Sequence, residues 1–280
     1  MPRINHNIPA MITGTSLRAV EREMSKSLEK LSTGLRINRA ADDAAGLSVS
    51  EQLRTQVNGL NVGARNAQDG TALLNISEGA LIEVDSMLQR MRELAIQSAN
   101  DTLTSRERSY TDLEFNQLRT EIDRIVTGTQ YNGQALLDGS APWGAGGVLH
   151  VGPNNRSATD TIIVTINAIS TGAIGMAISD NVYLTGQVSS TTAISILDNA
   201  LFSVNTLRAQ LGAITNRLEH AIANQENQEQ NMAAAESVIR DADFAYETTK
   251  FTRNQIISQS STAMLAQANS IPQSVLSLLK

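Results

Sequence analysis

The adjacent carboxylates Asp42 and Asp43 come closest, by residue type and spacing, to a catalytic or metal-binding pair. They lie in the stretch NRAADDAAGL, where the pattern predicts the start of a helix. Adjacent side chains on a helix point about 100° apart, so these two carboxylates would not converge on one ion. Negative charge near a helix N-terminus is favourable by a few tenths to about 1 kcal/mol. We therefore predict that both aspartates have a structural role.

The other residues able to do chemistry are scattered. The three histidines, His6, His150 and His220, are isolated, and none belongs to a His-x-x-x-His or His-Glu-x-x-His pair that could hold zinc. The glycine-rich nucleotide-binding motifs and the Gly-x-Ser-x-Gly nucleophile motif do not occur in the sequence. We predict no enzyme, no catalytic or metal site, and no cofactor.

Composition narrows the class of protein further. Aromatic residues make up 3% of the 280 residues, which favours thin layers of long helices over a thick globular core. The formal net charge of −6, without a Lys/Arg cluster, argues against nucleic acid as a partner. The sequence has no cysteine, so disulfides and thiolate metal sites are excluded. We find no signal-peptide core and no run of about 18 apolar residues, so we expect no membrane insertion, and secretion would need a route without a cleaved signal.

Long helices are predicted by apolar residues that recur at heptad spacing. The series near the start of the chain includes the expected packing residues Leu17, Val20, Met24, Leu28 and Leu31. A helix expected at about 45–99 has consecutive heptad positions at Leu53, Leu60, Ala67, Leu74, Leu81, Leu88 and Ala95. Such a helix would be roughly 80 Å long. The capping-box spacing of Thr104 and Glu107 predicts a further helix, which continues to Gly128 and folds back antiparallel.

The middle of the chain has a different character. Between about 129 and 190, Asn-Gly and Asp-Gly dipeptides and a β-branched run at 162–166 predict β-hairpins and loops. The region is too short for a large inserted domain. We therefore expect a small β region beside the helices.

Helix is expected to resume near Thr191, with a heptad series at Leu197, Val204, Leu211, Leu218, Gln225, Met232 and Ile239, in which Gln225 is polar. A last helix is expected at about 244–279, and Pro272 is predicted to end or bend it early. Its expected packing residues are Phe251, Ile257, Met264, Leu265, Leu276 and Leu279.

These patterns predict a mainly α fold with long antiparallel coiled-coil-like helices in two layers and a small central β-hairpin region. Because the chain runs out and returns, residues 1–43 and 241–280 are expected to form a terminal coiled-coil domain. Residues 44–240 would form a second helical domain, with its β and loop region at 129–190. Each layer is too thin to bury its apolar stripe alone, so we predict burial against other copies of the chain.

Several blocks of the sequence together resemble bacterial flagellin, the subunit of the flagellar filament. They occur in the family's order and include both ends of the chain. The blocks are INHN at 4–7, LEKLSTGLRINRAADDAAGLSVSEQLR at 28–54, LQRMRELAIQSAND at 88–101, EIDRI at 121–125, YNGQALL at 131–137, SVIRDADFAYE at 237–247 and QSSTAMLAQANSIPQSVLSLL at 259–279.

The resemblance implies a structural protein that polymerises into the filament for motility, is exported unfolded and assembles through its terminal helices. In flagellins the two termini pair as an inner layer, and the next segments form a surrounding helical layer. Residues 32–46 correspond to the joint between these layers, with site residues Gly34, Arg36, Arg39, Asp42 and Asp43. Gly34 would let the backbone leave the first helix. The two arginines would pair with carboxylates of neighbouring subunits.

The resemblance also implies partners and a location. The partners are other copies of the chain, an export chaperone, and the filament cap and hook-junction proteins. The location is extracellular, with a periplasmic filament as the alternative. The block LQRMRELAIQSAN would contact the next subunit along a protofilament and would also be recognised by an innate immune receptor of animals. The receptor-facing positions would be Arg90, Leu94, Gln97 and Glu114.

Two alternatives remain open at this point. One is a hook–filament junction protein, a relative with similar terminal helices. The other is a soluble coiled-coil adaptor without a filament role, whose terminal helices would be ordered in the monomer.

Overall fold

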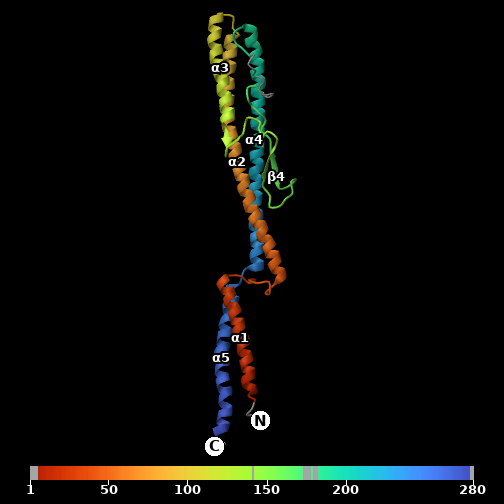
Figure 1. The fold of residues 1–280 in the computed structure, drawn as a ribbon, viewed down its shortest axis with the longest axis vertical. Helices are drawn as coiled ribbons and strands as arrows, with labels where there is room; N and C mark the ends of the chain where they lie inside the picture. Colours follow the sequence, from red (N-terminus) through yellow and green to blue (C-terminus); the bar gives the residue numbers. More distant parts are fainter. Residues whose placement is uncertain (1–5, 141, 173–177, 179–181, 278–280) are drawn as a thin grey trace. The chain divides into compact units, whose positions relative to one another are not determined.

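The computed structural model describes residues 6–140, 142–172, 178 and 182–277, with side chains as far as residue 270. Most of the described chain is helical (Figure 1), as the sequence predicted. The elements in chain order are α1 (Ile8–Thr33), α2 (Ala44–Ser98), α3 (Ser105–Gly128), β1 (Gln130–Tyr131), β2 (Gln134–Ala135), β3 (Gly147–His150), β4 (Thr161–Val164), α4 (Gln187–Arg240) and α5 (Phe244–Ser277).

The chain divides into two compact units. The terminal unit comprises Met1–Thr55 and Asn231–Lys280, and the central unit comprises Gln56–Gln230. The division falls inside α2 and α4, whereas the sequence predicted domain boundaries at residues 43 and 241. Each long helix therefore contributes to both units.

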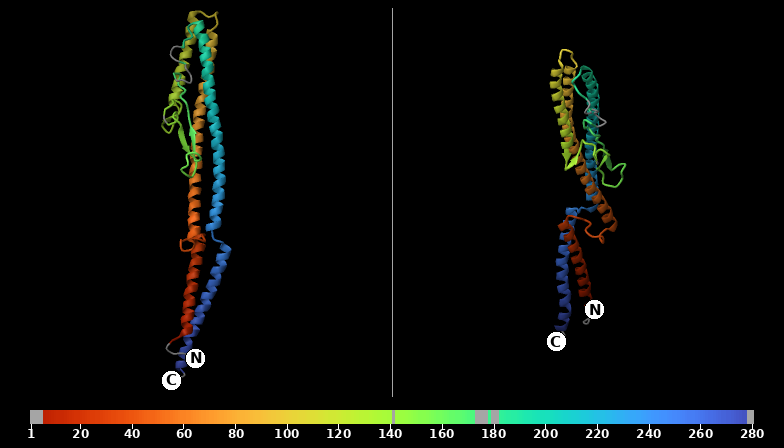
Figure 2. Two further views of the ribbon diagram at one scale, coloured as in Figure 1. Left: turned by 90° about the vertical axis from the view of Figure 1, so that its right-hand side faces the viewer. Right: turned by 45° about the horizontal axis from the view of Figure 1, so that its top comes forward.

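In the central unit, α3 and long stretches of α2 and α4 lie side by side (Figures 1 and 2). The α2 heptad positions from Leu60 to Ala95 are at most 1% exposed, and so are the α4 positions from Leu197 to Leu218. Phe115 of α3 is buried in the same apolar cluster. Each helix contributes one apolar stripe to a shared core, as the heptad spacing predicted.

The start of α3 is stabilised by the predicted capping box. Thr104 Oγ1 accepts a hydrogen bond from the backbone N–H of Glu107 at 3.4 Å. Glu107 Oε2 accepts one from the backbone N–H of Thr104 at 2.7 Å. The hydrogen bond from the Thr104 backbone lowers the pKa of the Glu107 carboxyl. The two bonds satisfy N–H groups that have no partner within the helix.

The predicted β-hairpin region is confirmed by two small antiparallel pairs. β1 and β2 are joined by Asn132 and Gly133, whose φ angles of 50° and 76° belong to the turn that Asn-Gly favours. β3 and β4 pair with Val148 opposite Ile163. Both hairpins lie in the central unit.

The segment after β3 packs directly on α2, because glycines of that helix leave room for it. A Cβ atom at Gly59 would collide with Pro153, and one at Gly63 would collide with the carbonyl group of Val151. The side-chain amide of Gln225 donates a hydrogen bond to the same carbonyl oxygen. Gln225, the polar residue within the apolar heptad series of α4, therefore anchors this segment.

In the terminal unit, α1 and α5 lie side by side and run antiparallel (Figures 1 and 2). Asn7 Oδ1 accepts a hydrogen bond from the N–H of Ala10 at 3.2 Å, and Asn7 Nδ2 donates one to the carbonyl of Ala268 at 2.9 Å. α5 continues past Pro272 to Ser277, so the early end predicted at Pro272 is wrong. A proline removes one hydrogen bond of the helix, and the neighbouring bonds still hold the last turn.

Candidate functional site

The described side chains of the terminal unit form almost no apolar core. Among its described side chains, Ile37 and Ala268 are the only apolar ones that are buried. In the central unit, by contrast, one buried apolar cluster joins residues of α2, α3, α4 and the hairpin region. Two helices in contact each bury one narrow stripe and leave the rest of their surface open. The uncovered faces of α1 and α5 are therefore the leading candidate for a binding surface.

The packing residues predicted for α1 are only partly covered. Leu17, Val20, Met24 and Leu31 are half-buried. Leu28 is 56% exposed. The predicted stripe of α1 thus needs further contacts to become fully buried.

The packing residues predicted for α5 behave in the same way. Phe251 and Leu265 are half-buried, whereas Ile257 and Met264 are exposed. The side chain of Leu276 and the whole of Leu279 lie outside the described residues.

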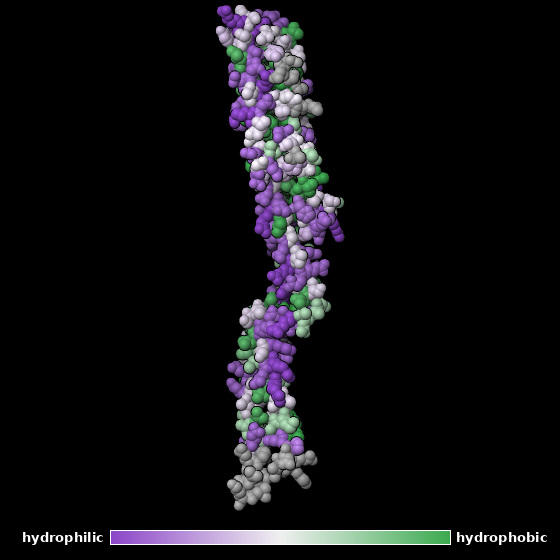
Figure 3. Space-filling model, viewed as in Figure 1, coloured by the Kyte–Doolittle hydropathy of each residue, from purple (hydrophilic) through white to green (hydrophobic). Residues whose placement is uncertain are grey.

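Sequence reasoning missed other exposed apolar residues of the terminal unit. The most exposed ones on α1 and α5 are Met11, Ile12, Phe244, Tyr246 and Ile256. Figure 3 shows hydrophobic side chains at the surface of this unit. Met11 and Ile12 lie outside the heptad phase of Leu17 and Leu31, so a search for one stripe passes over them. Counting apolar residues on every side of each helix, and not only at the heptad positions, would have found these residues.

The predicted joint begins where α1 ends. Gly34 has a left-handed φ of 73°, and its N–H donates a hydrogen bond to the carbonyl of Lys30 at 2.9 Å. The Gly34 carbonyl accepts a hydrogen bond from the N–H of Ala242 at 2.9 Å, and Leu35 forms an isolated β-bridge with Asp241. Gly34 thus ends the helix and contacts the connection between α4 and α5.

Both joint arginines have partners within the chain. Arg36 Nη2 donates a hydrogen bond to the carbonyl of Ile239 at 2.7 Å, in the last turn of α4. Arg39 Nη2 lies 2.9 Å from Glu29 Oε1. A cation is favourable beside the carbonyl groups at a helix C-terminus. The pairing of these arginines with neighbouring subunits stays a prediction, and it would compete with the contacts inside the chain.

The joint aspartates bind two different stretches of backbone. Asp42 Oδ2 accepts hydrogen bonds from the N–H groups of Arg39 at 3.0 Å and Asn38 at 3.3 Å. The bond from the Arg39 backbone lowers the pKa of the Asp42 carboxyl. Asp43 Oδ1 accepts a hydrogen bond from the N–H of Gly46 at 2.9 Å, in the first turn of α2. Asp43 thus lies at the helix start that the sequence predicted, whereas Asp42 binds the backbone of the turn before it.

Arg240, at the end of α4, is a joint residue that sequence reasoning missed. Its side chain is largely buried, and Nη1 lies 2.6 Å from Glu51 Oε1. Its carbonyl accepts a hydrogen bond from the N–H of Arg36 at 2.6 Å. A basic residue in the last turn of a helix is a known C-terminal signal, and it could have pointed to this position.

The predicted receptor-facing positions do not all lie on the surface. Arg90 Nε lies 2.9 Å from Glu114 Oε1, and both side chains are about half exposed. The hydrogen bonds that Arg90 donates to the Glu114 and Glu93 carboxylates raise the pKa of Arg90. Gln97 is exposed. Leu94 is 2% exposed and belongs to the core, so its prediction as a surface contact is wrong.

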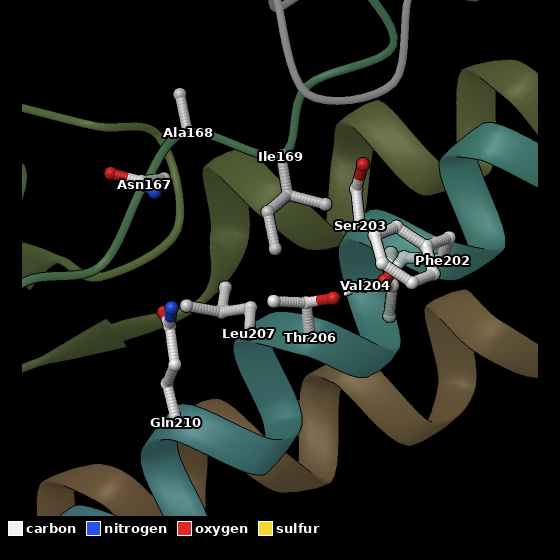
Figure 4. Close-up of a pocket in the computed structure, with 9 residues that line it drawn as sticks. All are labelled: Asn167, Ala168, Ile169, Phe202, Ser203, Val204, Thr206, Leu207 and Gln210. Atoms are coloured by element: carbon white, nitrogen blue, oxygen red, sulfur yellow. Dashed lines mark hydrogen bonds between the residues drawn. The ribbon is translucent and has the colours of Figure 1, made fainter.

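The described residues offer little that could do chemistry. A hollow of about 210 Å³ lies between α4 and the segment after β4 (Figure 4). Its lining has no charged side chain and consists of Asn167, Ala168, Ile169, Phe202, Ser203, Val204, Thr206, Leu207 and Gln210. In the part of the chain that the structure describes, no cluster of His, Cys, Asp or Glu side chains could hold a metal ion. The same residues include no helix with the length and apolar character to span a membrane.

Comparison with known proteins matches nearly the whole chain. The family model described as the bacterial flagellin N-terminal helical region matches residues 4–141, and the bacterial flagellin C-terminal helical region matches residues 194–279. A flagellin of Halalkalibacterium halodurans is 46% identical over 279 residues, with 99% of each chain covered. Flagellin FlaB2 of Treponema pallidum is 42% identical over 284 residues, also with 99% of each chain covered. The crystal structure of Bacillus cereus flagellin is 32% identical and covers 61% of this chain and 94% of its own, with a TM-score of 0.50.

Proposed function

Because the chain belongs to the bacterial flagellin family and is a structural subunit of the flagellar filament, we propose that burial of the exposed faces of α1 and α5 against other copies drives its polymerisation. The observation that supports this proposal is the near absence of an apolar core among the described side chains of the terminal unit. Ile37 and Ala268 are its buried apolar residues among the described side chains. Contacts with other copies would supply the missing core.

The energetics favour ordering of the terminal helices on assembly. α1 and α5 contain 26 and 34 residues. Fixing the backbone costs about 1–2 kcal/mol per residue, and isolated helices are marginal in water. Each large aliphatic side chain that becomes fully buried contributes about 1.5–3 kcal/mol. In the monomer few of the described side chains of α1 and α5 make this contribution, whereas in the filament most of them would.

The chain forms a homopolymer, and we propose that its contacts are heterologous. A patch on one copy would meet a different patch on the next copy, and such contacts produce an open helical filament when the rotation does not close a ring. The protofilament contact predicted for residues 88–100 belongs to the same proposal.

The finer statements about export and partners are also proposals. The chain would leave the cell unfolded, and a chaperone would cover the apolar face of α5 before export. Filament cap and hook-junction proteins would contact the ends of the polymer. The filament would be extracellular, which surface labelling of intact cells tests against a periplasmic position.

The proposed immune-receptor surface is smaller than the sequence suggested. It would consist of Arg90, Gln97 and Glu114, since Leu94 is buried. A receptor would have to replace or accommodate the ion pair between Arg90 and Glu114. Binding of purified monomer to the receptor ectodomain, with Gln97→Ala and Glu114→Ala variants, tests this surface.

Two alternatives make different predictions. A hook–filament junction protein would occupy one boundary of the flagellum and would not form long filaments alone. A coiled-coil adaptor would remain monomeric, with ordered and protease-resistant termini. The matches to flagellins across 99% of the chain favour the filament subunit.

Electron microscopy of purified full-length chain after addition of filament seeds tests the assembly proposal. Long filaments are expected from the full chain, and none from a chain that lacks residues 241–280. The double variant Ile12→Ser/Ile256→Ser should need at least about tenfold more monomer to polymerise, because two exposed apolar residues lose their burial in the filament.

The matched control is Ser16→Ala, which changes an exposed polar residue of α1 and should polymerise like the parent. Normal filaments from the truncated chain would contradict the proposal. So would a full chain that stays monomeric with protease-resistant ends, and that result would favour the adaptor.

A further inference from the structure

A set of charged side chains crosses the contact between α1 and α5 in the terminal unit. Lys30 Nζ lies 3.6 Å from Glu247 Oε1, and Lys250 Nζ lies 3.3 Å from Glu23 Oε2. Ser27 lies on α1 between Glu23 and Lys30 and is 1% exposed. We call these five residues the polar layer.

The side chain of Glu247 in the polar layer is buried, and its burial there depends on its ion pair with Lys30. The Glu247 side chain is 6% exposed, and Lys30 is its ion-pair partner. Ser27 Oγ and Glu247 Oε2 are buried without a hydrogen-bond partner among the described residues. A buried carboxylate is costly when it lacks a cation, and removing one partner of a buried pair is strongly destabilising. The contact therefore tolerates Glu247 only where a cation faces it.

Apolar side chains define the alignment of α1 against α5 poorly. Apolar positions of α1 recur at heptad spacing, and Leu17, Met24 and Leu31 follow one another at intervals of seven residues. A shift of α5 by one heptad would place similar side chains opposite each other, and side chains of similar volume substitute for one another at low cost. Several of these side chains are also half-buried or exposed, so their burial contributes little to the choice between registers.

The charged residues, by contrast, distinguish the registers. In a shift that brings residues seven positions earlier along the chain opposite α1, Lys30 would face Arg240, the last residue of α4, and Glu23 would face Asp243, the residue before α5. Both pairs have like charges and would repel each other. This shifted register is therefore opposed at two positions at once.

The opposite shift also loses both ion pairs. Lys30 would face Asn254, and Glu23 would face Ile257. Both lysine–glutamate attractions would be lost, and a charged group would lie against an apolar side chain. Either one-heptad shift is thus worse than the observed alignment.

We propose that the polar layer sets the register of α1 against α5 in the assembled filament. It pairs opposite charges in one register and removes or opposes those pairs in the neighbouring ones. A single buried polar position is known to specify register in coiled coils in this way. The inference rests on the proposed function, because the filament is where we expect both terminal helices to be ordered.

The connection between α1 and α2 does not by itself prevent a shift. A one-heptad shift moves α5 along α1 by about 10 Å. Residues 34–43 form the connection, and a chain of this length can extend to roughly 33 Å. The contacts of Gly34, Leu35 and Arg36 with residues 239–242 would break, but the covalent connection would remain long enough.

Disulfide formation in filaments can report the register, because the chain has no cysteine of its own. Asn7→Cys with Ala268→Cys reports the observed register, since Asn7 contacts Ala268. Asn7→Cys with Ser261→Cys reports the shift toward Arg240, since residue 261 lies one heptad earlier. Filaments are oxidised and then dissolved, and the cross-linked single chain is measured on a denaturing gel. Disulfides need Cα atoms within about 7 Å, so the two reporters do not overlap.

The double variant Glu23→Lys/Lys30→Glu inverts the charges of α1 without changing the net charge. In the observed register each reversed side chain would face a like charge, and in the shifted register it would face an opposite charge. We expect the ratio of the Ala268 to the Ser261 cross-link to fall by on the order of tenfold. The parent chain should give the Ala268 cross-link almost alone.

The control is the quadruple variant that adds Glu247→Lys/Lys250→Glu, which restores both opposite-charge pairs of the observed register and should raise the ratio above that of the double variant. It also covers the case in which the double variant forms no filaments, since recovery of filaments that give the Ala268 cross-link would support the inference. An unchanged ratio in the double variant, or no recovery in the quadruple variant, would overturn it. Filaments from the parent chain would still support the proposed function in that case. Failure of the parent chain to polymerise would instead remove the proposed function and this inference with it.

Discussion

Substitution of Gly63 by alanine should detach the segment after β3 from α2 and destabilise the central unit. The Cβ atom added at Gly63 would overlap the carbonyl oxygen and carbon of Val151. These are backbone atoms, so they cannot move aside as the end of a flexible side chain can. The carbonyl also accepts the hydrogen bond of the Gln225 side chain, which is buried.

The expected loss of stability is about 2–4 kcal/mol. Leaving the buried Gln225 amide without its acceptor costs about 1–3 kcal/mol. Val151 is buried, and exposing a valine side chain costs up to about 1.5–3 kcal/mol. Replacing a helical glycine by alanine returns about 1 kcal/mol of helix propensity. The net effect is therefore clearly destabilising even though alanine is the better helix former.

Urea unfolding of the full-length monomer, followed by circular dichroism, measures this effect. Gly79→Ala is the matched control, because Gly79 lies on the same helix and an added Cβ atom would have nothing within 4 Å. That variant should be as stable as the parent or up to about 1 kcal/mol more stable. If Gly63→Ala were as stable as Gly79→Ala, the close packing of the segment after β3 on α2 would be refuted.

Three further predictions concern local backbone chemistry, each measured by urea unfolding. Thr104→Ala should cost about 1 kcal/mol, because it removes one acceptor of the α3 capping box, and an unchanged midpoint would contradict that role. The folded pKa of Glu107 lies below its ordinary value of 4.5, so its stabilising effect is present above that pH and is lost as the pH falls through the folded pKa. Glu107→Gln should therefore lose less stability than the parent on acidification below about pH 4.5, and parallel pH profiles would argue against the effect. Gly133→Ala should cost about 1–2 kcal/mol, since its φ is 76°, whereas Gly128→Ala, with open space around the added Cβ, should not.

The long helices could be predicted because their signals are local. The helix expected at about 45–99 is found as α2 at Ala44–Ser98, and α3 starts at the predicted capping box. Heptad spacing and caps depend on residues a few positions apart, so they can be read without knowledge of the fold. The Asn-Gly turn between β1 and β2 is another signal of this kind.

The roles of several single residues could not be read in this way. The sequence block around Leu94 predicted a surface position, yet the Leu94 side chain of α2 is buried in the core. Gln225 looks like a defect in the heptad series of α4, yet it binds the carbonyl of Val151, far away in the sequence. Nothing in the sequence around Gly63 predicted that the backbone of Val151 packs against it.

The sequence by itself determined the helical class, the family and the positions of most helix ends, because periodicity, caps and sequence blocks are properties of neighbouring residues. Only the tertiary structure decided which side chains meet across the fold. Lys30 and Glu247 are separated by most of the chain, and their ion pair follows from the antiparallel contact of α1 and α5. The low burial of the described apolar side chains in the terminal unit is a property of the same kind, because burial depends on what covers a helix and not on the helix alone.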